Sequence, residues 1–138
     1  MDKKKILVVD DDQDILKALS VRLGAHNYAT VFAKDAVSAI NQAKDESPDL
    51  IILDLGLPDG TGFIVMDRLQ QIDSLASIPV IIITGRPQHV YKDVALLAGA
   101  KAYLQKPLEN AELLSAVRRA LDDSPGSQTG SPDQTKLD

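Results

Sequence analysis

Short aliphatic blocks alternate along the chain with segments of helical periodicity. Three blocks, at residues 6–9, 50–53 and 80–83, consist of Val, Ile and Leu, and each is bounded on at least one side by Asp or Pro. This pattern is typical of strands that are buried on both faces of a sheet. Residues 29–33 and 101–104 are weaker strand candidates that suit the outer positions of the same sheet.

Between these blocks the apolar residues recur every three or four positions, as on one face of an amphipathic helix. Strand and helix signals alternate five times, and strands joined by helices pair in parallel through right-handed crossovers. We therefore predict an α/β fold, in which helices cover both faces of a five-stranded parallel sheet. The apolar positions of the five predicted helices are Ile15, Leu19 and Leu23; Ala36, Ala39, Ile40 and Ala43; Val65, Leu69 and Ile72; Val90, Val94 and Leu97; and Leu113, Ala116, Val117 and Ala120.

The composition changes after residue 122. Residues 123–138 contain Leu137 as their one large apolar side chain, which is too little to build a core. We interpret residues 1–122 as one folded domain and residues 123–138 as a flexible linker or tail. The total length of 138 residues agrees with a single domain.

Composition and charge exclude several classes of protein. Without cysteine there is no disulfide framework, thiolate metal site or cysteine nucleophile. The net charge of -5 and the lack of a basic stripe argue against direct binding to nucleic acid or to a membrane. The apolar run after the basic residues 3–5 is too short for a signal peptide or a membrane span, so we expect a cytoplasmic protein.

Polar residues follow the predicted strands at their carboxyl ends, where parallel sheets form their ligand crevice. Two carboxylates ~4 Å apart repel by ~4 kcal/mol at an effective dielectric constant near ~20, so converging acids need a counter-charge. A hard divalent cation together with one lysine would meet that need. The residues in question are Asp10, Asp11 and Asp12 after the first strand, Asp54 after the third, Thr84 after the fourth, and Lys106 and Pro107 after the fifth.

These residues also have ordinary structural explanations. Acids such as Asp12 and Asp14 often only stabilise the N-terminus of a following helix, here one beginning near Gln13. Thr84 would serve equally well as a capping hydroxyl. The functional interpretation is stronger because polar groups of matching chemistry follow four separate strands of one predicted sheet.

Four segments resemble the receiver domain of two-component response regulators. They are VVDDD at 8–12, LDLGLPDGTG at 53–62, ITG at 83–85 and GAKAYLQKP at 99–107, and the likeness runs in order over residues 4–122. The resemblance implies a doubly wound, flavodoxin-like sheet with strand order 2-1-3-4-5. It also implies a cis peptide bond between Lys106 and Pro107.

Carried over position by position, the resemblance makes Asp54 the phosphoacceptor. It assigns Asp10 and Asp11 to Mg²⁺, with Mn²⁺ as the alternative ion. Asp54 itself and the backbone carbonyl of Gly56 would be further ligands.

The same resemblance makes Thr84 the switch hydroxyl and Lys106 the phosphate-binding lysine. Tyr103 would be the aromatic side chain whose rotamer reports the state. We expect the phosphoryl group to draw Thr84 and Lys106 inward, which opens space for Tyr103 to rotate toward the core. Gly56 and Arg86 occupy the positions that tune the lifetime of the phosphoryl group.

The partners also follow from the resemblance. It implies a histidine kinase or histidine phosphotransfer protein as phosphoryl donor, and an output domain or partner outside this chain. We expect no enzymatic activity beyond the domain's own phosphotransfer and autodephosphorylation. Lys101 and Ala102 stand where many DNA-binding regulators of the family carry acids that pair across a dimer, so at most a weak homodimer is expected.

Two other functions stay open at this point. A hydrolase of the haloacid dehalogenase type also forms an aspartyl phosphate, and Asp10 with Asp12 makes a D-x-D after the first strand. Gln13 and Asp14 do not continue that hydrolase pattern. The second is a phosphate-independent binding module, although every position of the receiver site is intact.

Overall fold

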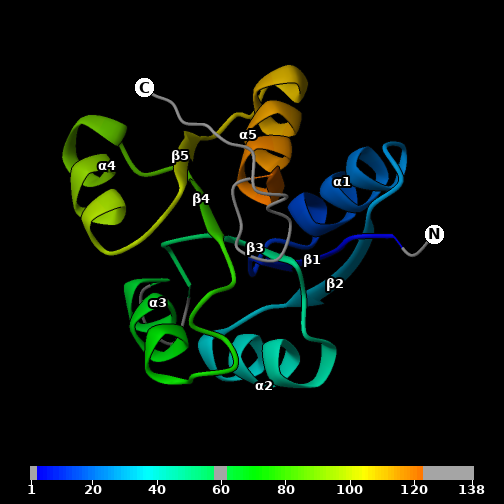
Figure 1. Ribbon diagram of the computed structural model, residues 1–138. Helices are drawn as coiled ribbons and strands as arrows, with labels where there is room; N and C mark the ends of the chain where they lie inside the picture. Colours follow the sequence, from blue (N-terminus) through cyan, green and yellow to red (C-terminus); the bar gives the residue numbers. More distant parts are fainter. Residues whose placement is uncertain (1–2, 58–61, 123–138) are drawn as a thin grey trace, which may run out of the picture.

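The computed structural model describes residues 3–57 and 62–122, so the predicted tail at 123–138 lies outside the described residues. Strands and helices alternate along the described chain, and the helices surround a central sheet (Figure 1). The elements are β1 (Lys5–Val9), α1 (Gln13–Gly24), β2 (Ala29–Ala33), α2 (Ala36–Glu46), β3 (Leu50–Leu53), α3 (Gly62–Gln71), β4 (Val80–Thr84), α4 (Gln88–Leu97), β5 (Ala102–Gln105) and α5 (Asn110–Asp122).

The sheet has the strand order β2-β1-β3-β4-β5 and every neighbouring pair is parallel, which confirms the predicted α/β fold and its order. All carboxyl ends therefore lie at one edge of the sheet. Val9 is paired with Leu53, so the residues that follow β1 and β3 emerge side by side. Thr84 is paired with Gln105, so the residues that follow β4 and β5 also emerge side by side.

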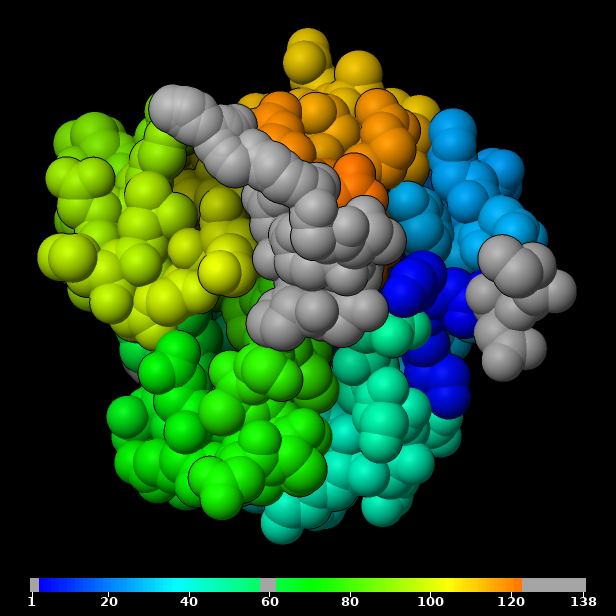
Figure 2. Space-filling view, in the orientation of Figure 1, coloured from blue at the N-terminus to red at the C-terminus, as the bar shows by residue number. Residues whose placement is uncertain are grey.

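The core has two layers, one on each face of the sheet. Alternate residues of β1 point to opposite layers: Leu7 and Val9 pack beneath α2 and α3, whereas Ile6 and Val8 pack beneath α1 and α5. Both layers are dominated by aliphatic side chains, as the low aromatic content predicts. Figure 2 shows the helices forming the outer surface around the sheet.

Helix α4 departs from the predicted pattern. Val90, Val94 and Leu97, which we predicted to pack on the sheet, are 52%, 52% and 88% exposed, and Ala95 is the residue of this helix that is buried. The prediction was wrong because periodicity identifies an apolar helix face without showing what covers it. By contrast, α5 buries six side chains.

The segment after β5 is tied to the end of β4. The backbone N–H of Lys106 donates to the carbonyl of Thr84 at 2.8 Å, and the Lys106–Pro107 peptide bond is cis, as the resemblance implied. Over the described ranges, no helix combines the length and the apolar character that crossing a membrane requires.

Asp35 caps helix α2, and its contribution is expected to depend on pH. Its carboxylate accepts a hydrogen bond from the backbone N–H of Ser38 at 2.8 Å, and this bond holds the pKa of Asp35 below its usual value. Because the folded-state pKa is lowered, the stabilising charge is present above the unfolded pKa of ~3.9 and is lost as pH falls through the folded pKa.

We therefore expect Asp35→Ala to lower the melting temperature by a few degrees at neutral pH and by clearly less below about pH 3. Thermal unfolding at a series of pH values checks this. Asp35→Asn keeps an acceptor for Ser38 and serves as the control. An equal loss for Asp35→Ala at both pH values would contradict the role of the charge.

Candidate functional site

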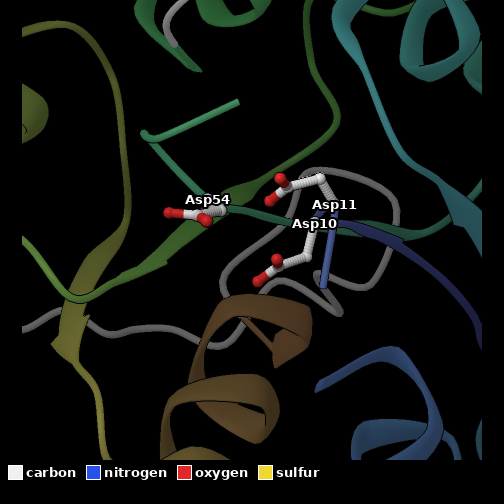
Figure 3. A group of neighbouring side chains, drawn as sticks. All are labelled: Asp10, Asp11 and Asp54. Atoms are coloured by element: carbon white, nitrogen blue, oxygen red, sulfur yellow. The ribbon is translucent and has the colours of Figure 1, made fainter. Parts of the chain in front are cut away.

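Three aspartates converge at the carboxyl edge of the sheet (Figure 3). Asp10 and Asp11 follow β1 and Asp54 follows β3, and their carboxylates offer oxygen atoms that all lie within 4.8 Å of one another. Asp10 is fully buried, Asp54 is buried and Asp11 is exposed. The strand order brings these acids together, since β1 and β3 are neighbours in the sheet.

Lys106 supplies positive charge to this cluster. Its Nζ lies 2.7 Å from Asp10 Oδ2 and 3.5 Å from Asp54 Oδ2. Burial alone would lower the pKa of Lys106, but the hydrogen bond to Asp10 and the charge of Asp54 outweigh it, so the pKa is raised and the ammonium form is kept.

The cluster is nevertheless short of positive charge. Burial raises the pKa of Asp10 despite its hydrogen bond with Lys106, because the carboxylate has lost its water. Among the described residues, the Lys106 ammonium forms ion pairs with Asp10 and Asp54, and the Asp11 carboxylate of the same group is not one of its partners. A cation with a preference for hard oxygen ligands would relieve this imbalance.

Thr84 presents a buried hydroxyl at the end of β4. Its Oγ1 accepts a hydrogen bond from the backbone N–H of Arg86 at 3.3 Å, and its side chain is 1% exposed. Within the part of the chain that the structure describes, this hydroxyl has no acceptor for its own proton. Buried hydroxyls normally find a partner, so the site is suited to a ligand with an acceptor oxygen.

Tyr103 on β5 lies inside the molecule. It is 5% exposed, and its hydroxyl donates to the backbone carbonyl of Arg86 at 2.8 Å. Burial raises the pKa of this phenol. The side chain therefore already occupies the inward position that we expected it to reach after phosphorylation.

Gly56 and Arg86 both border the space above Asp54. The Gly56 N–H donates to Asp54 Oδ1 at 3.1 Å. A Cβ added to Gly56 would lie 3.8 Å from that oxygen and 3.9 Å from Arg86 Nε. The Arg86 guanidinium therefore lies at the margin of the site.

Tyr91 on α4 is the neighbour of Arg86 that sequence reasoning missed. The Arg86 guanidinium lies 5.4 Å from the centroid of the Tyr91 ring, and its Nη1 donates to the Tyr91 hydroxyl at 3.5 Å. An arginine and a tyrosine five positions apart were the only sequence signal for this pair.

Asp12 has the structural role suggested for it. Its Oδ1 accepts hydrogen bonds from the backbone N–H groups of Asp14 at 2.9 Å and Ile15 at 3.4 Å, which caps the N-terminus of α1. Asp12 is not part of the carboxylate group formed by Asp10, Asp11 and Asp54. This arrangement weakens the D-x-D hydrolase alternative.

Comparison with known sequences shows the family to which this chain belongs. Residues 6–118 match the family described as the response regulator receiver domain. The transcriptional regulatory protein KdpE of Mycobacterium tuberculosis is 37% identical over 116 residues, which is 84% of this chain and 50% of KdpE. The alkaline phosphatase synthesis transcriptional regulatory protein PhoP of Bacillus subtilis is 34% identical over 129 residues, 91% of this chain and 53% of PhoP. The chain thus spans about half the length of these relatives.

Solved structures show the same fold. A CheY-like response regulator receiver domain from Methanospirillum hungatei matches 88% of this chain and 95% of its own, with a TM-score of 0.80 and 29% identity. The chemotaxis response regulator CheY4 of Vibrio cholerae matches 86% of this chain and 99% of its own, with a TM-score of 0.80 and 28% identity.

Proposed function

Because the chain belongs to the response regulator receiver domains of two-component signalling, we propose that Asp54 is the residue that accepts the phosphoryl group. The observation that carries this proposal is the arrangement around Asp54. Carboxylates, the Lys106 ammonium and the buried Thr84 hydroxyl, whose proton has no acceptor among residues 3–57 and 62–122, lie together at the carboxyl edge of the sheet.

The chemistry assigned to each side chain follows from this arrangement. An Asp54 carboxylate oxygen forms a bond to phosphorus while the bond from phosphorus to the donor's leaving group breaks, which leaves an acyl phosphate. The Lys106 ammonium neutralises negative charge on the transferred oxygens. Thr84 can donate its hydroxyl proton to one of them while its Oγ1 still accepts from the Arg86 backbone N–H.

A divalent cation fits the same carboxylates. Asp10, Asp11 and Asp54 offer hard oxygen ligands, and we assign the backbone carbonyl of Gly56 as a further one. Mg²⁺, or Mn²⁺ in its place, would supply positive charge beside the transferred phosphoryl group.

We further assign the partners by the family. The donor is a histidine kinase or histidine phosphotransfer protein, and the phosphorylated state acts on an output domain or partner outside this chain. The regulators KdpE and PhoP support an output function, since each extends well beyond its matched half. In this assignment the protein works in the cytoplasm, forms at most a weak homodimer and turns over no substrate apart from its own phosphoryl group.

The test is modification by a small acyl phosphate. With Mg²⁺ present, peptide mapping by mass spectrometry should locate the phosphoryl adduct on the peptide that contains Asp54, and a chelator should prevent its formation. An adduct on Asp10 would instead favour the hydrolase alternative.

Two further outcomes would count against the proposal. Modification that is unaffected by the chelator would contradict the metal assignment. A lack of any adduct would favour a phosphate-independent binding module.

Access to Asp54 should set the lifetime of the adduct. Gly56 provides no side chain to exclude water, so we expect hydrolysis on the order of minutes or less, by in-line attack on an open site. In Gly56→Met, a Cβ 3.8 Å from Asp54 Oδ1 begins a side chain that shields the phosphoryl group, and hydrolysis should slow several-fold. A dephosphorylation time course measures this, with Gly24→Met as a remote control. An unchanged rate would show that steric access is not in control.

A further inference from the structure

Arg86 joins the site to helix α4. Its backbone N–H donates to Thr84 Oγ1 at 3.3 Å, and its carbonyl accepts from the Tyr103 hydroxyl at 2.8 Å. Its guanidinium lies 5.4 Å from the centroid of the Tyr91 ring on α4. One residue thus contacts the switch hydroxyl, the buried aromatic side chain and a surface helix.

The Arg86 guanidinium also lies near the Asp54 carboxylate. Gly56 has no side chain between the two groups. A Cβ built on Gly56 would lie 3.9 Å from Arg86 Nε and 3.8 Å from Asp54 Oδ1. Across residues 3–57 and 62–122, Arg86 forms no ion pair with a carboxylate. Its side chain is held on the Tyr91 ring, at an intermediate degree of exposure.

We propose that Tyr91 is a positioning residue which holds the Arg86 guanidinium at the margin of the site, and that Arg86 leaves the ring for the phosphoryl oxygens once Asp54 is phosphorylated. This inference rests on the proposed phosphorylation of Asp54. A guanidinium binds phosphoryl oxygens through paired, charge-assisted hydrogen bonds, which are stronger than a cation–π contact at a partly exposed site.

The exchange couples the site to α4 in both directions. When Arg86 leaves, the Tyr91 hydroxyl loses the hydrogen bond that it accepts from Arg86 Nη1. The contact of α4 with the core is small, because Ala95 is the buried residue of this helix, so the loss acts on a lightly packed helix. Because such coupling is reciprocal, a stronger hold of residue 91 on Arg86 must weaken the binding of a phosphoryl group, and a weaker hold must strengthen it. The sign of the effect therefore depends on the side chain at position 91.

The experiment measures the affinity for beryllofluoride, a phosphoryl mimic, in the presence of Mg²⁺ by titration calorimetry. Tyr91→Leu removes the ring and should tighten binding by about two- to fivefold, the range of a cation–π contact. Tyr91→Trp offers a better cation–π surface and should weaken binding, whereas Tyr91→Phe keeps the ring and should stay near wild type. Val90→Ala, at an exposed position of the same helix, is the matched control and should change nothing.

A double-mutant cycle separates this proposal from a structural effect. In an Arg86→Gln background, Tyr91→Leu and Tyr91→Trp should no longer change the affinity. The proposal is overturned if Tyr91→Leu and Tyr91→Trp shift binding in the same direction, or if either shift persists without Arg86. Wild-type protein that does not bind beryllofluoride would refute the proposed function itself, which is a different outcome from a wild-type affinity that is insensitive to residue 91.

Discussion

Replacing Asp54 by asparagine is expected to abolish the phosphoryl adduct while leaving the fold as stable as the wild type. The amide of Asn has no carboxylate oxygen to form an acyl phosphate, yet it keeps an acceptor for the Gly56 N–H. The substitution also removes one of three mutually repelling charges. Lys106 retains its closer partner, Asp10, at 2.7 Å.

Two measurements on the same samples check this expectation. Mass spectrometry after treatment with Mg²⁺ and a small acyl phosphate reports the adduct, and thermal unfolding reports stability. Asp45→Asn, which removes an exposed acid from α2, is the matched control and should be modified normally. An undiminished adduct in Asp54→Asn would show that another residue is the phosphoacceptor.

A single methyl group at Gly62 is expected to destabilise the protein by about 2 kcal/mol or more. A Cβ at this first residue of α3 would lie 2.6 Å from the carbonyl oxygen of Asp54 and 2.9 Å from the Cα of Leu55. Both are backbone atoms, which cannot move aside as a flexible side chain would. The Gly62 N–H also donates to the Leu55 carbonyl at 2.9 Å, so displacing the helix would break that bond.

The matched control is Gly24→Ala in α1. A Cβ at Gly24 would meet no atom within 4 Å, so alanine should be neutral or stabilise the helix by about 0.5–1 kcal/mol. Denaturant unfolding of both variants gives the comparison. Because the Gly62 contact is with the backbone carbonyl of Asp54, the proposed phosphoacceptor, Gly62→Ala should also reduce adduct formation. Similar stabilities for the two variants would rule out the close approach.

Strands with sharp polar boundaries were predictable from the sequence. The range 50–53, which lies between Asp49 and Asp54, coincides with β3, and the weaker candidate at 29–33 coincides with β2. The last strand was predicted one residue too early, because Gln105 is polar and resembles a loop residue. In the fold Gln105 pairs with Thr84, and its Oε1 accepts from the backbone N–H of Gln88. That stabilisation is tertiary, so a local pattern does not show it.

The sequence was enough to predict which residues gather at the candidate site, but not which of their side chains contact one another. Asp10, Asp11 and Asp54 could be grouped because parallel strands end at one edge, although the order of the strands came from the family resemblance. The sequence did not show that Lys106 lies closer to Asp10 than to Asp54. The spacing of five positions between Arg86 and Tyr91 was too weak a signal to predict their contact, because contacts between side chains of a loop and a helix depend on how that helix is docked.

The exposed apolar positions of α4 have a consequence for how such a protein can diversify. Val90, Val94 and Leu97 contribute little to the core, so mutation can exchange them at a small loss of stability. None of the three belongs to the carboxylate group of Asp10, Asp11 and Asp54. After gene duplication, a copy could therefore acquire a new binding specificity at these three positions while Tyr91 and the carboxylate group are inherited unchanged.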